Sequence, residues 1–106
     1  MFQRIVVFGA GAIGSAYGAL LSRDNDVLLI GRKAHVETIN TRGLVVEGDY
    51  AGTYSPSATD NLEEILPETL LIVTTKAYDL VPALTSIRPL ILDDTVLLLL
   101  QNGLSI

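Results

Sequence analysis

Three glycines near the N-terminus are the first residues whose spacing indicates chemistry. They lie in the pattern G-x-G-x-x-G, which follows the apolar run 4–8 directly and opens a segment of helix-forming residues. In that context, the first glycine permits a tight turn, the second lets the backbone approach a pyrophosphate, and the third lets the helix pack against the sheet. The alternative is a packing turn that binds nothing. We predict that the pyrophosphate of a dinucleotide is bound by Gly9, Ala10, Gly11, Ala12, Ile13 and Gly14.

Arg32 follows the second apolar run, 27–30, at the position that distinguishes the two nicotinamide dinucleotides. An NAD site usually has Asp or Glu here to accept a hydrogen bond from the ribose 2′-hydroxyl. This chain has Arg32 and Lys33 instead, and its next acid is Glu37. A guanidinium binds a phosphate through paired, charge-assisted hydrogen bonds, so we predict NADPH or NADP, with Arg32 on the 2′-phosphate. The alternative is that Arg32 and Lys33 only begin a solvated helix.

Polar side chains also follow two later apolar runs. Lys76 comes after the run 70–75, and Asn102 comes after 95–100. Ligands of open parallel sheets bind beyond the carboxyl ends of the strands, so we predict that Lys76 contacts a ligand phosphate or carboxylate. Asn102 has the donor and acceptor groups that suit a ribose, a carboxamide or a substrate oxygen, although Asn-Gly is also an ordinary turn.

The elements that must position these residues alternate between strands and helices. Strands without polar alternation indicate a parallel sheet that is covered on both faces, and therefore an α/β, Rossmann-type, doubly wound fold. A hairpin of 44–47 with 52–54 interrupts the alternation. The predicted strands are 4–8, 27–30, 70–75 and 95–100, all buried, and the predicted helices are 12–23, 33–42, 62–66 and one that begins at Leu80.

Local signals set the ends of these helices. Gly43 is placed as the C-terminal cap of the second helix. Asp60 and Glu63 form a capping pair for the short helix 62–66. Asp79 is the predicted N-cap of the last helix, with Pro82 in its first turn and an apolar face formed by Leu80, Leu84, Ile87 and Ile91.

Composition narrows the classes of function. The 106 residues suit a single domain, and 49% are hydrophobic. The net charge of −5 argues against a nucleic-acid partner. The chain has no cysteine and one histidine, His35, which excludes disulfides, thiolate metal sites and histidine metal clusters. We place His35 on the exposed face of the second helix without a catalytic role.

The uncharged run Ile5–Ser22 has the composition of a signal segment or a membrane helix, with a G-x-x-x-G pattern at Gly14 and Gly18. It is at the short limit for a membrane span and is rich in glycine. A strand followed by a helix explains it better, so no membrane partner is expected.

Four stretches, taken together, resemble the N-terminal NADP-binding domain of the ketopantoate reductase (2-dehydropantoate 2-reductase) family. The glycine pattern is shared by many dehydrogenases, whereas K-A-Y-D and Q-N-G-L at successive strand ends are more particular. Ser105 stands where the family often has a further glycine. The matching stretches are 7–14, 29–32, 75–79 and 100–104.

The resemblance implies a cytoplasmic enzyme that reduces 2-dehydropantoate, a small 2-keto acid, to pantoate with NADPH on the route to pantothenate and coenzyme A. It implies that Lys76 contacts the cofactor and that Asn102 reaches both the nicotinamide and the substrate. The family also has a helical C-terminal domain with a proton-donating lysine. We therefore expect residues 1–106 to be a dinucleotide-binding domain that ends before the last elements of its fold. We expect no catalytic residue, weak NADPH binding and no turnover, while the oligomeric state stays open.

Two alternatives remain at this stage. A non-catalytic domain that senses a dinucleotide would explain the short length, but it would not need Lys76 or Asn102. Another NADP-dependent hydroxyacid dehydrogenase would fit equally well, because substrate choice lies mostly in the domain that this chain lacks.

Overall fold

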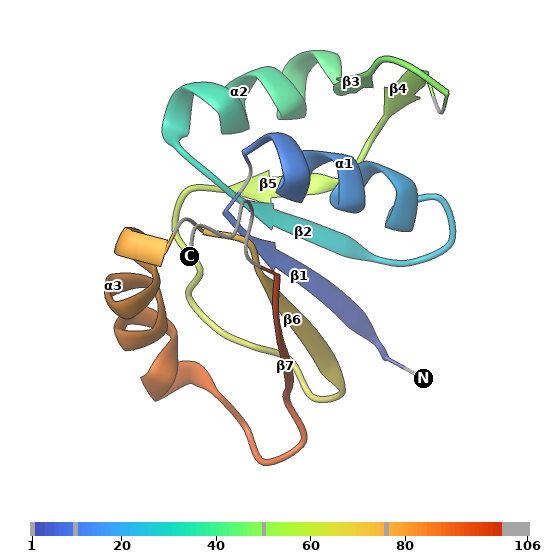
Figure 1. The fold of residues 1–106 in the computed structure, drawn as a ribbon. Coiled ribbons are helices and arrows are strands. Elements are labelled where there is room, and N and C mark those ends of the chain that lie inside the picture. Colours follow the sequence, from blue (N-terminus) through green and yellow to red (C-terminus); the bar gives the residue numbers. More distant parts are fainter. Residues whose placement is uncertain (1, 10, 50, 76, 101–106) are drawn as a thin grey trace.

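The computed structural model of the chain describes residues 2–9, 11–49, 51–75 and 77–100. A parallel sheet with the strand order β5-β2-β1-β6-β7 forms its centre, with helices on both faces (Figure 1). This arrangement confirms the predicted Rossmann-type α/β fold. The strands of the sheet are β1 (Arg4–Phe8), β2 (Val27–Ile30), β5 (Ser57–Thr59), β6 (Thr69–Val73) and β7 (Val96–Leu99). The helices are α1 (Ala12–Leu21), α2 (Lys33–Arg42), α3 (Ala77–Ile87) and the 3₁₀ turn η1 (Arg88–Leu90), and β3 (Leu44–Val46) pairs with β4 (Gly52–Tyr54) in an antiparallel hairpin.

The central strands are apolar along their whole length because both of their faces are buried. Alternate residues point to opposite faces, so Ile5 and Val7 of β1 join one core cluster and Val6 joins the other. The first cluster lies under α1 and α2 and includes Ala19 and Ile39. The second includes Ile87 from α3. Burial on both faces explains why the sequence of these strands lacks polar alternation.

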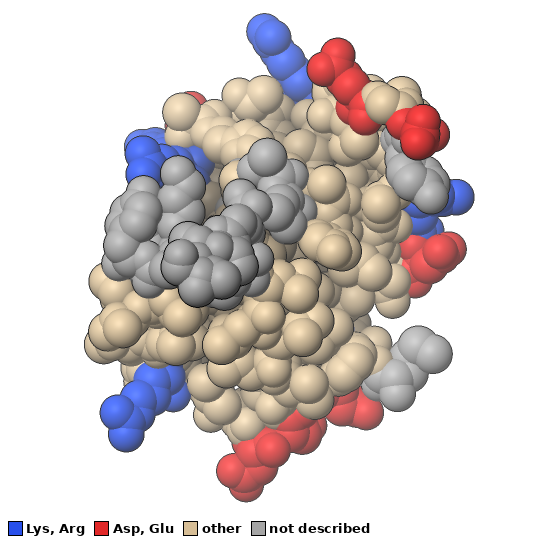
Figure 2. Space-filling view, in the orientation of Figure 1, with Lys and Arg blue, Asp and Glu red and all other residues tan. Residues whose placement is uncertain are grey.

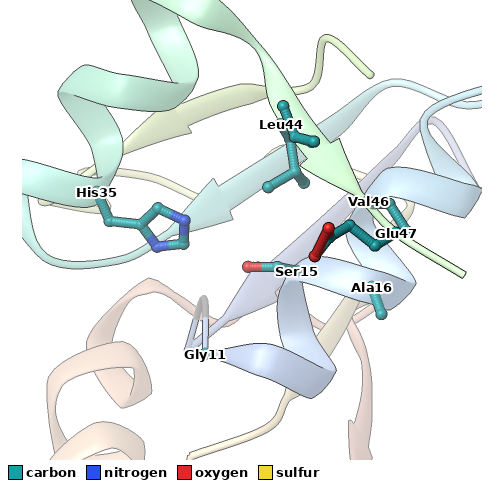
Figure 3. Close-up of a pocket in the computed structure, with 8 residues that line it drawn as sticks. Gly11, Ser15, Ala16, His35, Leu44, Val46 and Glu47 are labelled. Carbon is teal, nitrogen blue, oxygen red and sulfur yellow. The ribbon is translucent and has the colours of Figure 1, made fainter. Parts of the chain in front are cut away.

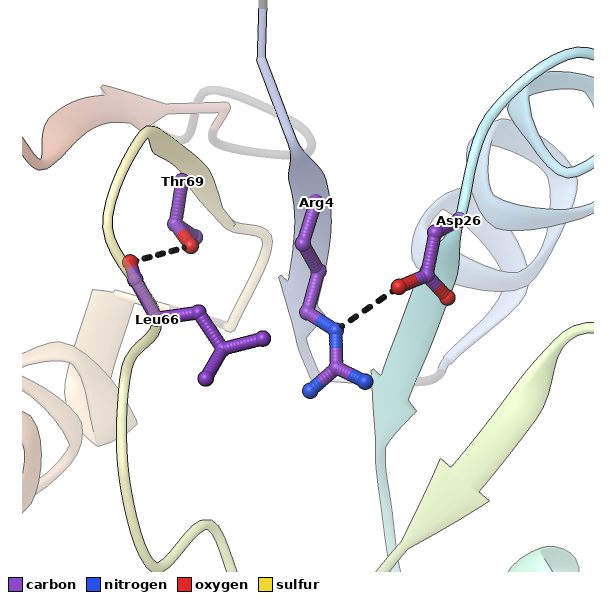
Figure 4. Close-up of polar contacts among 4 residues, drawn as sticks. All are labelled: Arg4, Asp26, Leu66 and Thr69. Atoms are coloured by element: carbon purple, nitrogen blue, oxygen red, sulfur yellow. Dashed lines mark hydrogen bonds and ion pairs between the residues drawn. The ribbon is translucent and has the colours of Figure 1, made fainter.

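Polar contacts fix the end of the sheet that lies opposite the carboxyl ends of the strands (Figure 4). The Arg4 side chain donates to the Asp26 carboxylate at 3.1 Å, which links the start of β1 to the segment that enters β2. Thr69, at the start of β6, is fully buried, and its hydroxyl donates to the carbonyl of Leu66 at 2.7 Å. The first contact links two neighbouring strands, and the second fixes the turn that enters β6. An exposed ion pair such as the first contributes at most about 1 kcal/mol.

Most of the predicted elements are confirmed. Helix α2 has the predicted bounds, and it ends at Gly43, whose N–H donates to the carbonyl of Ile39 at 2.9 Å. The β3–β4 hairpin is present, and α1 ends two residues earlier than predicted, at Leu21. Within the described residues, no helix has the length and apolarity that crossing a bilayer requires.

The predicted short helix 62–66 is wrong, and strand β5 was not predicted. Pro67 follows that segment and disfavours helical backbone at Leu66, so a helix there would have barely one turn. The chain is irregular instead, and Ile65 is buried against the second cluster. Strand β5 exists because it pairs with β2, and the Asn40 side chain donates to the carbonyl of Ala58 at 3.1 Å. Its short, mixed sequence contains no strong strand signal.

The predicted start of the last helix is also wrong. Helix α3 begins at Ala77, so Asp79 lies inside it and is not the N-cap residue, and Pro82 is an interior residue. Alanine has the highest helix propensity, which favours the earlier start. The predicted apolar face is confirmed for Leu80, Leu84 and Ile87, which pack in the second cluster. Ile91 lies beyond η1 and is exposed.

Strand β7 is not buried as predicted. Val96 to Leu99 are between 41% and 46% exposed, and neither core cluster includes them. Among the described strands, β7 pairs with β6 alone, so it is an edge strand. It lies near the middle of the view in Figure 1. In Figure 2 the coloured acidic and basic side chains lie around the rim of this view, and tan residues occupy the part of its middle that the grey residues leave visible. The apolar sequence of β7 therefore does not reflect burial by the described residues.

Because β6 is buried and β7 is exposed, the same substitution should lower the free energy of unfolding more in β6 than in β7. Leu71 of β6 is fully buried and lies opposite Leu97 of β7, which is 41% exposed. Leu71→Ala should lower the free energy of unfolding by about 3 kcal/mol because it leaves a cavity. Leu97→Ala should lower it by about 1 kcal/mol or less, because no cavity forms. Urea unfolding of the two variants measures both values, and equal losses would show that β7 is covered in solution.

Candidate functional site

The candidate site lies where the carboxyl ends of the central strands meet. Phe8 of β1 is in register with Ile30 of β2 on one side and Val73 of β6 on the other. The order of the strands along the chain reverses at β1, since β2 lies to one side and β6 to the other. Open α/β sheets bind ligands at such a switch point. The residues that directly follow these strands are therefore the ones to consider.

The glycine turn after β1 is held in place by hydrogen bonds from both neighbouring strands. Gly9 has φ +106°, a backbone conformation that residues with a side chain rarely adopt. Its N–H donates to the carbonyl of Ile30 at 3.0 Å, and its own carbonyl accepts from the Thr74 hydroxyl at 2.6 Å. No motif in the sequence marks Thr74, because only the parallel pairing of β1 with β6 brings it under the turn. Gly9 is thus hydrogen-bonded to both strands that flank β1.

Gly14 allows α1 to begin in contact with this turn. A Cβ at Gly14 would collide with the carbonyl oxygen of Gly9 and would lie 2.7 Å from the Thr74 hydroxyl. One helical turn later, a Cβ at Gly18 would collide with the side chain of Leu29 in β2. The packing role predicted for Gly14 is therefore confirmed.

Gly11 differs from the other glycines of the motif because the space beside it is open. Apart from its chain neighbours, no atom of the described residues would lie within 4 Å of a Cβ there. Gly11 is also the N-cap residue of α1, and its carbonyl accepts from the N–H of Ser15 at 2.8 Å. The first turn of a helix has N–H groups without intrahelical acceptors, and these favour an anion. An approaching phosphate would therefore find both space and donors at Gly11.

The other predicted ligand residues are only partly described. Ala12 and Ile13 form the first turn of α1, which places their backbone next to Gly11. Arg32 is exposed at the N-cap of α2, directly beyond the carboxyl end of β2, and Lys33 beside it is also exposed. Ala10, Lys76 and Asn102 lie outside the described residues.

The hydroxyl of Thr75 is a further polar group beside the glycine turn. It is buried, and within the described part of the chain it has no hydrogen-bond partner. Thr75 adjoins the glycine turn, because a Cβ at Gly9 would lie 3.2 Å from its backbone nitrogen. Leaving a buried hydroxyl unpaired costs about 1–3 kcal/mol, and such groups in native proteins call for an explanation, of which a functional role is one.

A groove of about 470 Å³ opens beside Gly11, between α1, the start of α2 and the β3–β4 hairpin (Figure 3). His35 lines this groove and is half-buried, so its predicted place on the exposed face of α2 is wrong. The sequence could not show this, because the hairpin that closes the groove packs there only in the folded chain. The remaining lining residues are Ser15, Ala16, Leu44, Val45, Val46 and Glu47.

Comparison with known proteins agrees with this geometry. The family model described as ketopantoate reductase PanE/ApbA matches residues 5–106. A 2-dehydropantoate 2-reductase of Pyrococcus horikoshii is 44% identical over 103 residues, which are 96% of this chain and 34% of that protein.

Solved structures show the same relationship. A 2-dehydropantoate 2-reductase of Geobacter metallireducens GS-15 superimposes with a TM-score of 0.80 at 38% identity, covering 96% of this chain and 35% of that one. A D-mandelate dehydrogenase solved with NADH and anilino(oxo)acetate gives 0.81 at 34% identity, covering 96% and 34%.

The chain spans about a third of the length of the curated relatives that it matches. The family model and these relatives match nearly all of its residues, including the glycine turn. An oxidoreductase family is consistent with that turn at the switch point of a parallel sheet. On this evidence the chain belongs to the ketopantoate reductase family of oxidoreductases.

Proposed function

We propose that this chain is the NADPH-binding part of an enzyme that reduces 2-dehydropantoate to pantoate in the synthesis of pantothenate and coenzyme A. The observation that carries the proposal is the open space at Gly11 on an otherwise tightly packed glycine turn. A turn that served packing alone would not need an open, donor-rich face at the switch point of the sheet. Membership of the family supplies the substrate class.

The residues present fit a dinucleotide. Its pyrophosphate would lie against the first turn of α1, where Gly11 leaves room for it and backbone N–H groups donate. The Thr75 hydroxyl, which lacks a partner, adjoins the same turn. When bound, the nicotinamide supplies the hydride for the keto carbon, and the role of this chain is to bind and orient the cofactor.

The preference for NADPH rests on Arg32. It is exposed at the start of α2, where a guanidinium can reach a ribose 2′-phosphate, and the first acid in the sequence after the end of β2 is Glu37. The D-mandelate dehydrogenase that is similar to this chain was solved with NADH, so the choice between the cofactors varies among similar folds. Measured affinities for NADPH and NADH therefore decide the cofactor preference of this chain.

Lys76 and Asn102 complete the proposed site by their places in the sequence. Lys76 comes three residues after the end of β6, and Asn102 three residues after the end of β7, which is the next strand of the sheet. We assign cofactor contact to Lys76, and contact with the nicotinamide and the 2-keto acid to Asn102. The family resemblance implies a proton donor in a helical domain outside these residues. We therefore expect residues 1–106 alone to bind NADPH weakly and not to turn over substrate, and we propose a cytoplasmic location.

A second candidate activity is the reduction of a different 2-keto acid. The similarity to D-mandelate dehydrogenase favours it, because that enzyme has the same fold over 96% of this chain. The two candidates share the cofactor site and differ in the substrate pocket. Turnover of 2-dehydropantoate against benzoylformate, the keto acid that corresponds to mandelate, by the full-length gene product distinguishes them.

The role of Arg32 can be tested by calorimetric titration with NADPH and NADH. Arg32→Ala should weaken NADPH binding about tenfold and leave NADH binding unchanged, because only NADPH carries the 2′-phosphate. Arg23→Ala removes an equal charge just after the end of α1 and serves as the control, with both affinities unchanged. Equal affinity of the unmodified chain for the two cofactors, unaffected by Arg32→Ala, would contradict the assignment.

The two glycines Gly11 and Gly14 should respond differently to alanine. Gly14→Ala should lower the free energy of unfolding by about 2 kcal/mol or more, because its Cβ meets the carbonyl of Gly9. Gly11→Ala should leave stability within about 0.5 kcal/mol, because its Cβ enters open space, and should weaken binding of both cofactors about tenfold by occupying the phosphate position. Urea unfolding and titration separate the two effects. Unchanged cofactor binding in Gly11→Ala would place the pyrophosphate elsewhere.

A further inference from the structure

The groove beside Gly11 contains side chains that the proposed function has not used. His35 enters it from the first turn of α2, and Glu47 enters it from the end of β3. In Figure 3 the imidazole of His35 and the hydroxyl of Ser15 point toward one another above Gly11, and the Glu47 side chain lies on the far side of Ser15. Two elements that are distant along the chain thus bring an imidazole and a carboxylate to one groove.

The position of this groove relates it to the cofactor. Gly11 belongs both to the glycine turn and to the groove, so a dinucleotide on the turn would have one side against the groove. His35 lies one helical turn from Arg32, which is proposed to bind the 2′-phosphate, and Lys33 lies between them. The groove is therefore next to the part of the ligand that distinguishes NADPH from NADH.

The lining of the groove favours strong electrostatic effects. Its walls include the apolar side chains of Ala16, Leu44 and Val46, and His35 is half-buried among them. Charges next to apolar walls interact more strongly than charges in open water. An imidazole N–H donates to a phosphate oxygen whether or not the ring is charged, while a carboxylate only accepts hydrogen bonds and repels a phosphate.

We propose that His35 and Glu47 set the cofactor preference of this chain in opposite directions, with His35 donating to the 2′-phosphate and Glu47 opposing it from the other side of the groove. The inference rests on the proposed function, because it needs a dinucleotide on the glycine turn. The preference for NADPH over NADH would then depend on His35 and Glu47 as well as on Arg32. Along the chain the next acid after Arg32 is Glu37, whereas folding also brings Glu47 of the hairpin to the groove.

The test compares ligands that differ by the 2′-phosphate alone. Dissociation constants are measured for NADPH against NADH, and for adenosine 2′,5′-bisphosphate against AMP. His35→Leu should reduce the preference for the 2′-phosphorylated ligand about fivefold, and His35→Gln, which keeps a donor, should restore part of it. Glu47→Gln should increase the preference about threefold, since an exposed charge has a smaller effect. Glu37→Gln, on α2 but not in the groove lining, should change nothing.

The outcomes separate this inference from the function on which it rests. A ratio of affinities is insensitive to a general loss of folded protein, so a structural effect of His35→Leu would weaken both ligands of a pair equally. If Arg32→Ala abolishes the preference while the His35 and Glu47 variants leave it unchanged, the inference is wrong and the cofactor assignment stands. If the unmodified chain binds none of the four ligands, both are wrong. Shifts of opposite sign in the His35 and Glu47 variants support the inference.

Discussion

Helix α1 can begin where it does only because position 14 has no side chain. The carbonyl of Gly9 and the hydroxyl of Thr74 occupy the space that a Cβ at Gly14 would need. That close approach places the open end of α1 at the switch point of the sheet, beside the carboxyl ends of β1, β2 and β6. Without it, the N–H groups of the first helical turn would lie farther from the strand ends, and the turn would lose its support from Thr74. The position of the candidate site therefore follows from this single steric constraint.

The sequence predicted those parts of the fold whose signals are local. Apolar runs gave the central strands, and Gly43 marked the end of α2. It did not predict β5, because Ser57–Thr59 becomes a strand only through its pairing with β2. The helix 62–66 had a local capping signal that Pro67 overrides. The burial of β7 was wrong for a related reason, since an apolar strand shows that cover is needed but not whether the described residues supply it.

The candidate site divides in the same way. The glycine motif and Arg32 are contiguous with strand ends, so their positions could be predicted from sequence. Thr74 and Thr75 take their places from the pairing of β6 with β1, and His35 and Glu47 take theirs from the packing of the hairpin against α1 and α2. No periodicity or motif contains that information. Sequence reasoning thus predicted the glycine turn at the switch point of the sheet and missed the groove beside it.

The hydrogen bond between Gly9 and Thr74 joins residues that are 65 positions apart in the chain. Bringing such distant residues together costs loop-closure entropy, and long-range pairing of parallel strands is slow for that reason. The glycine turn therefore cannot reach its final form as a local nucleus during folding. It forms only when β6 docks against β1, which also completes the apolar centre of the sheet. A folded glycine turn therefore requires that the centre of the sheet is already paired, so loss of the β1–β6 pairing would also dismantle the candidate site.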